Sequence, residues 1–135
     1  VALTEELEYN EKYIELQRIR TSNLNFVIYN VSGNPNGLYI APMLFIPFIE
    51  NAFKYATDKK IEHAIDISIA IHGTELTFHC TNAIDNLSAL PQLKGGVGME
   101  LIQNRLDLMY PRHKLIIDKT EVQYSVNLSL DLSED

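Results

Sequence analysis

Apolar side chains recur at helical spacing in three stretches of the chain, which predicts three helices. The first covers residues 1–20, where Thr4 is the expected N-cap before two glutamates. The second covers about residues 43–56 and follows Pro42, a residue tolerated in the first turn of a helix. The third covers about residues 99–109 and is ended by a proline.

Alternating and β-branched stretches predict the strands between these helices. The clearest covers residues 65–71, where four isoleucines alternate with polar or small residues, as on a half-buried strand. A tight turn then returns the chain along residues 76–81. Further strands are expected over residues 24–31, 38–40, 114–118 and 121–130.

The order of these elements sets the expected fold class. Short hairpin connections dominate, so the sheet should be mixed and mostly antiparallel, with the helices covering one face. We therefore expect an α/β (α+β) two-layer sandwich. A length of 135 residues suits one domain, residues 1–135, with an N-terminal helix over residues 1–20.

Composition narrows the classes of function. The hydrophobic share of 46% and the charged share of 21% are typical of a globular domain. A net charge of −7 argues against a nucleic-acid partner, which needs a basic face. It does not exclude ATP, whose phosphates are bound locally by amides, a lysine and a metal ion. The single cysteine, Cys80, is expected to be a buried apolar residue.

Two segments carry candidate chemistry. In residues 47–55, P-F-I-E-N-A-F-K-Y, helical spacing places Asn51, Lys54 and Tyr55 on one face. An amide oxygen can ligate Mg²⁺, an ammonium group can bind a phosphate and an aromatic ring can lie against a base. The polar face of an ordinary amphipathic helix would give the same pattern.

The second segment is G-G-V-G, residues 95–98, which runs directly into the third helix. Glycines let the backbone approach a phosphate, and a helix start offers unpaired N–H groups. The stretch has neither the Walker A pattern nor a surrounding βαβ unit, so it predicts neither a P-loop nor a Rossmann site. By itself it is equally compatible with a loop hinge.

In this order and at this separation, the two segments resemble the ATP-binding catalytic domain of sensor histidine kinases, in the gyrase/Hsp90/histidine kinase/MutL superfamily. Residues 47–55 resemble its N-box, residues 96–99 its glycine-rich G-box, and residues 104–106, N-R-L, the motif that follows. Residues 3–20, which begin L-T-E-E-L-E-Y, resemble the opening helix of one group of these kinases. The resemblance covers nearly the whole chain and implies a Bergerat-type ATP-binding fold.

The resemblance also implies a role for each matched residue. Asn51 would ligate Mg²⁺, Lys54 would contact phosphate oxygens and Tyr55 would line the nucleotide pocket. Glu50 joins Asn51 and Lys54 as a candidate catalytic residue. Residues 82–95 would form a mobile lid over ATP. Phosphates would be bound by the glycine-rich stretch, Gly96, Val97, Gly98 and Met99.

Two positions depart from the family's pattern. Asn82 stands where the family has an aspartate that accepts a hydrogen bond from the adenine amino group, and the following glycines are missing. An amide oxygen can still accept that bond, but more weakly. Pro47 stands one turn before Asn51, where hydrolases of the superfamily carry a water-activating glutamate. Glu50 is next to Asn51 in the sequence but points about 100° away from Asn51 on the helix. A missing base suits a kinase, which should not hydrolyse ATP.

The favoured hypothesis is a kinase that uses ATP and Mg²⁺ to phosphorylate a histidine on a dimerisation domain of the same protein, with a response regulator as the next partner. The alternatives are a nucleotide-binding or scaffolding pseudokinase, which Asn82 supports, and a chaperone-type or topoisomerase-type ATPase, which Pro47 disfavours.

The chain's own histidines are not expected to accept phosphate, because none lies on a long helix followed by an acid. They are not expected to bind metal either, because they lack the spacing of metal ligands. They are His63, His72, His79 and His113. Since the chain opens without a methionine, we expect an excised domain. It has no apolar run long enough to span a membrane. Its parent is expected to be a membrane-anchored, homodimeric bacterial sensor with this domain in the cytoplasm.

Overall fold

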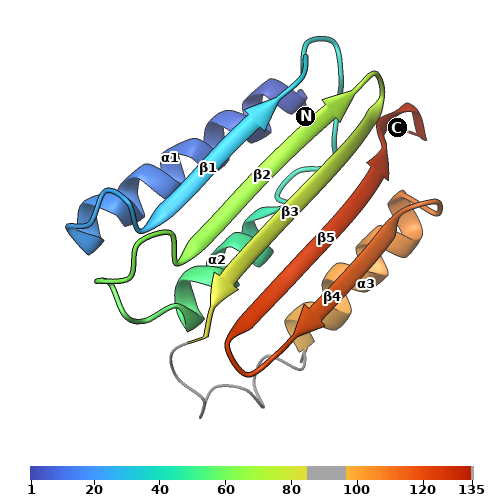
Figure 1. Ribbon diagram of the computed structural model, residues 1–135. Coiled ribbons are helices and arrows are strands. Elements are labelled where there is room, and N and C mark those ends of the chain that lie inside the picture. Colours follow the sequence, from blue (N-terminus) through green and yellow to red (C-terminus); the bar gives the residue numbers. More distant parts are fainter. Residues whose placement is uncertain (85–96, 135) are drawn as a thin grey trace.

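Figure 1 shows a computed structural model of the chain, which describes residues 1–84 and 97–134. The elements are α1 (Leu3–Thr21), β1 (Val27–Ser32), α2 (Ile46–Tyr55), β2 (Ile65–His72), β3 (Glu75–Ala83), α3 (Val97–Met109), β4 (Lys114–Lys119), β5 (Gln123–Asp131) and the short 3-10 helix η2 (Leu132–Glu134).

The strands form one five-stranded sheet in the order β1-β2-β3-β5-β4. The β1–β2 pair is parallel, and the other three pairs are antiparallel. The three helices α1, α2 and α3 lie side by side on one face of the sheet, and the opposite face is open (Figure 1). The predicted two-layer α/β sandwich with a mixed, mostly antiparallel sheet is therefore confirmed.

The core fills the space between the sheet and the helices. The four isoleucines of β2 are buried, as their alternation predicts. On β3, Leu76, Phe78 and Cys80 are buried in the same alternating way. Phe45, next to α2, stacks on Phe78 with ring centroids 4.7 Å apart, so α2 packs against the central strand β3.

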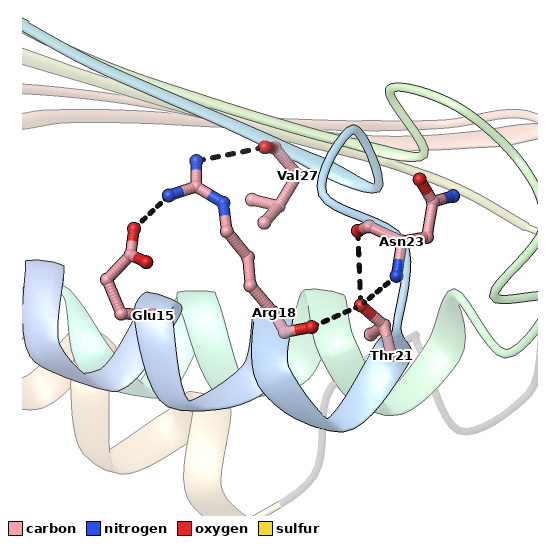
Figure 2. Close-up of polar contacts among 5 residues, drawn as sticks. All are labelled: Glu15, Arg18, Thr21, Asn23 and Val27. Carbon is pink, nitrogen blue, oxygen red and sulfur yellow. Dashed lines mark hydrogen bonds and ion pairs between the residues drawn. The ribbon is translucent and has the colours of Figure 1, made fainter.

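A small polar cluster fixes the last turns of α1 to the sheet (Figure 2). The Arg18 guanidinium donates a hydrogen bond of 3.1 Å to the carbonyl of Val27, the first residue of β1, and pairs with Glu15. The Thr21 hydroxyl lies 2.9 Å from the Arg18 carbonyl and accepts the N–H of Asn23 at 3.2 Å. These bonds end α1 and hold it beside β1.

Several predicted boundaries are wrong. Thr4 lies inside α1, and the N-cap is Ala2, whose side chain has no hydrogen-bonding group. Residues 38–40, which the structure describes in full, do not form the expected strand. They make one isolated β-bridge, from Tyr39 to Ala2. α2 begins later than predicted because Met43 has a φ of 58°, which a right-handed helix does not allow.

Residues 41–45, here called the α2 leader, are held by the helices on either side of α2. From α1, the Glu6 carboxylate accepts the N–H of Leu44 at 3.2 Å. From α3, the Arg105 guanidinium donates to the carbonyl of Pro42 at 2.7 Å. The Ala41 N–H also donates to the hydroxyl of Tyr110, just after α3, at 2.9 Å. The α2 leader is therefore held from both sides, which fixes where α2 starts.

Glu6 is only 4% exposed, and burial raises the pKa of its carboxyl group above the ordinary value of 4.5. The N–H groups of Leu44 and Met43, which donate to the carboxylate, oppose this shift, as does the positive charge of Arg105. Burial is the largest of these effects, so the folded protein releases the Glu6 proton at a higher pH than the unfolded chain does.

This difference makes a testable prediction about pH and stability. Between about 4.5 and the raised pKa, the folded state binds more protons than the unfolded state, so the Glu6 contribution to the free energy of unfolding falls as pH rises. Glu6→Gln removes this titration, so the variant should gain stability relative to the unsubstituted protein across that window. Urea unfolding at a series of pH values measures the difference, with the exposed neighbour Glu5→Gln as control. Identical pH dependence in both variants would contradict the prediction.

Candidate functional site

The predicted site residues gather at one end of the helix layer. Asn51, Lys54 and Tyr55 lie in the last turns of α2, Asn82 lies near the end of β3, and Met99 lies in the first turn of α3. Figure 1 shows that these three element ends lie at the same end of the molecule, the lower end in that view. The structure thus brings together residues that are up to 48 positions apart, from Asn51 to Met99.

α2 exposes a narrow stripe and buries the rest of its surface. The stripe consists of Pro47, Glu50, Asn51 and Lys54, of which Lys54 and Glu50 are exposed and Asn51 is half-buried. Its remaining residues are buried against the sheet and α1. Within the described part of the chain, the Asn51 amide makes no hydrogen bond to a protein group, so it is available to a ligand.

Tyr55 lies beside this stripe instead of on it. The Tyr55 side chain is 4% exposed, although the Lys54 ammonium nitrogen lies 5.4 Å from the centroid of its ring. On β5, the buried Tyr124 has a raised pKa, caused by burial with smaller contributions from Cys80 and Tyr55. The two phenols are therefore close, and Tyr55 belongs to the wall between α2 and β5.

Asn82 faces the helix layer from β3. It lies two residues beyond the inward-facing Cys80, it is 2% exposed, and it pairs with Tyr124 across the β3–β5 ladder. Its amide nitrogen donates a 3.1 Å hydrogen bond to the Ala83 carbonyl. Among the described residues, no group donates a hydrogen bond to its amide oxygen.

Tyr124 was not predicted as a site residue, and the structure places it opposite Asn82 and near Tyr55. Its position on an alternating strand predicts that it is buried, but the pairing of β3 with β5 cannot be read from the sequence. Gly96 and residues 85–95 of the expected lid lie outside the described residues, whereas Asn82 and Ala83 are part of β3. Val97 and Gly98 open α3.

A hollow of about 460 Å³ lies beside the stripe, between α1 and α2. Its lining comprises Tyr13 and Gln17 from α1 and Pro47, Glu50, Asn51, Phe53 and Lys54 from α2. Helical spacing places Glu50 about 100° around the helix from Asn51. The hollow is nevertheless wide enough that Glu50 and Asn51 line it together.

The other reactive side chains have structural roles. Cys80 is buried, as predicted, and burial raises the pKa of its thiol to about 12, so the thiol is unreactive. The histidines lie on strands or in loops, as the sequence predicts. Among the described residues, no group of three His, Cys, Asp or Glu side chains is placed to hold a metal ion. No helix in the described ranges is long and apolar enough to cross a membrane.

Comparisons with known proteins agree with this geometry. No protein-family model matches the chain. The sensor protein kinase HptS of Staphylococcus aureus (strains USA300 and NCTC 8325) is 27% identical over 135 residues, which are 98% of this chain and 25% of HptS. The chain thus spans about a quarter of the length of the curated relatives it matches.

Solved structures share the fold. The catalytic domain of histidine kinase ThkA has a TM-score of 0.67 at 10% identity and covers 100% of this chain and 97% of that one. The histidine kinase domain of the blue-light-activated kinase EL346 from Erythrobacter litoralis has a TM-score of 0.60 at 13% identity, over 94% of this chain and 65% of that one.

The chain is thus similar to a sensor kinase in sequence and to histidine kinase catalytic domains in fold. The resemblance to the ATP-binding catalytic domain of sensor histidine kinases is confirmed, since a sensor kinase matches 98% of the chain and the solved neighbours are histidine kinase domains. This similarity supports a function within a sensor kinase.

Proposed function

We propose that this chain binds ATP with Mg²⁺ and transfers the γ-phosphate to a histidine on a dimerisation domain of the same protein. A response regulator would be the next acceptor. The observation that carries the proposal is the convergence of the α2 stripe, Asn82 and the start of α3 at one end of the helix layer. We also propose that the parent protein is a membrane-anchored homodimer with this domain, residues 1–135, in the cytoplasm.

The proposed nucleotide lies with its adenine towards β3 and β5 and its phosphates over the α2 stripe. Asn82 offers a buried amide oxygen to the adenine amino group, and Tyr55 supplies a buried aromatic wall. Lys54 carries an exposed ammonium group for phosphate oxygens. The first N–H groups of α3, at Val97, Gly98 and Met99, would bind phosphates as helix N-termini do.

The residues present fit Mg²⁺ bound together with a nucleotide. Mg²⁺ prefers oxygen ligands and keeps several waters, so one protein oxygen with phosphates and water can complete its shell. The half-buried Asn51 amide, unengaged among the described residues, is such an oxygen. When bound, the ion would neutralise phosphate charge, while Asn51 and Lys54 orient the phosphates for transfer.

A pseudokinase is the second candidate, and Asn82 is the observation that favours it. A neutral amide where the family has an aspartate weakens the expected adenine contact. Incubation of the full-length protein with γ-labelled ATP and Mg²⁺ separates the two candidates. Acid-labile label on a histidine supports the kinase, and ATP binding without label supports the pseudokinase.

The first prediction for this site concerns Mg²⁺. Asn51→Ala should reduce ATP affinity in the presence of Mg²⁺ to the level measured in EDTA, because the variant loses the protein ligand of the ion. A titration with a fluorescent ATP analogue, with and without Mg²⁺, measures this. Asn36→Ala, in an exposed loop, is the matched control. Retention of the full Mg²⁺ effect by Asn51→Ala would remove Asn51 from the site.

The second prediction concerns adenine recognition. Asn82→Asp should tighten adenine-nucleotide binding by roughly 1 kcal/mol, because the hydrogen bond becomes charge-assisted. The same change should lower the stability of the nucleotide-free protein by about 1–3 kcal/mol, because a buried carboxylate replaces the amide that donates to Ala83. Calorimetric titration and thermal unfolding measure the two effects. Unchanged or lost nucleotide binding would show that Asn82 does not contact adenine.

The third prediction concerns the 135-residue chain by itself. Its histidines do not lie on helices, and Pro47 leaves no carboxylate one turn before Asn51 to activate water. The chain should therefore bind ATP without labelling itself or hydrolysing ATP appreciably. Addition of the protein's dimerisation helices should restore acid-labile labelling. Rapid release of phosphate by the 135-residue chain would favour an ATPase instead.

A further inference from the structure

The α2 stripe has two unlike sides. Tyr55 is displaced about 40° around the helix from Asn51 in one direction, and Glu50 about 100° in the other. The Tyr55 side faces β5 and is closed, since Tyr55 and Tyr124 are both buried. The Glu50 side faces α1 and opens into the hollow of about 460 Å³.

The α1 wall of this hollow is held in place. Tyr13 and Gln17 lie one helical turn apart, and the Tyr13 ring packs edge-on against Phe53 with centroids 5.9 Å apart at 71°. Burial raises the pKa of Tyr13, and the Glu50 charge adds to the shift, so the Glu50 carboxylate lies near the phenol. The Arg18 bond to Val27 fixes the same helix to the sheet (Figure 2).

Three polar side chains of the hollow have no hydrogen-bond or ion-pair partner among the described residues. In the parts of the chain that the structure describes, the side chains of Gln17, Glu50 and Asn51 make no hydrogen bond or ion pair. Glu50 is exposed, and Lys54, one turn on, is directed over the Tyr55 ring. An unpaired carboxylate therefore lies beside the two side chains that are proposed to hold the phosphates.

Phosphoryl transfer requires the attacking and leaving groups to be roughly in line. In the proposed function, the adenine lies on the Tyr55 and Asn82 side of Asn51, so ADP must leave towards that side. The nucleophile must then approach from the opposite side, which is the hollow. An imidazole nucleophile needs a lone pair on the attacking nitrogen and its proton on the other nitrogen, a tautomer that a hydrogen bond to a carboxylate selects.

We propose that the hollow between α1 and α2 receives the acceptor imidazole, and that Glu50 accepts the N–H of the ring nitrogen that does not react. This inference rests on the proposed function. The free nitrogen forms a bond to the γ-phosphorus, and the bond between that phosphorus and the β–γ bridging oxygen breaks, with its electron pair leaving on ADP. The remaining N–H proton stays hydrogen-bonded to Glu50 and passes to that carboxylate or to water.

The test uses the full-length protein, γ-labelled ATP and Mg²⁺, with ATP affinity measured in parallel. Glu50→Ala should lower the initial rate of histidine labelling by about 10²-fold, in the range for loss of a positioned proton acceptor. Glu50→Gln, which retains a neutral acceptor, should lie between Glu50→Ala and the unsubstituted protein. ATP affinity should stay within about twofold, because Glu50 contacts the acceptor and not the nucleotide.

A second pair of variants tests the hollow itself. Gln17→Trp fills it from α1 and should slow labelling without weakening ATP binding. Leu16→Trp, at the neighbouring position that is 50% exposed and does not line the hollow, should change neither. Circular dichroism establishes that all four variants are folded.

The inference is overturned if Glu50→Ala and Gln17→Trp label at the unsubstituted rate. A fall in labelling matched by an equal fall in ATP affinity also overturns it, because Glu50 would then belong to the nucleotide site. Failure of the proposed function is distinguishable, since the unsubstituted protein would then bind no ATP or would bind it without labelling.

Discussion

The position of α2 depends on the polar bonds that hold residues 41–45, and the site depends on α2. Glu6 of α1 accepts an N–H of this leader, and Arg105 of α3 donates to two of its carbonyls, at 2.7 and 3.4 Å. Met43, within the leader, has a positive φ of 58°, a conformation that costs free energy in a non-glycine residue. Bonds from α1 and from α3 hold Met43 in this conformation. The two helices therefore fix the position of the α2 stripe relative to the end of β3.

Much of the fold follows from local patterns. The four isoleucines of β2 are buried on one face because strand side chains alternate, and the predicted helices form where apolar residues recur. α1 shows where such patterns fail. Polar Glu6 and Asn10 are buried there, whereas Leu16 and Ile19 are 50% and 74% exposed. The Glu6 partner, Leu44, is 38 residues away, so no local pattern can reveal the bond that keeps Glu6 inside.

Only those candidate site residues that lie within recognisable sequence motifs could be predicted. Asn51 and Lys54 were found through residue types and spacing, and Asn82 through the resemblance to the kinase family. All three lie at one end of the helix layer. Tyr124 lacks any motif, and only the strand register brings it to Asn82. Gln17 likewise becomes part of the site surface only through the packing of α1 beside α2. Spacing along one helix can predict a face, but not which neighbouring element meets it.

The Asn82 departure from the family's pattern also has a structural explanation that does not require loss of activity. Its side chain is 2% exposed, and its amide donates to the Ala83 carbonyl, whereas an aspartate there would set a buried charge against that carbonyl oxygen. The amide thus suits the nucleotide-free fold, and in the proposed function it would make a weaker adenine contact. The proposed transfer would depend on the other side of α2, on Asn51, Lys54 and the hollow that Glu50 lines. A weakened adenine contact lowers affinity alone, so Asn82 by itself is a poor argument for a pseudokinase.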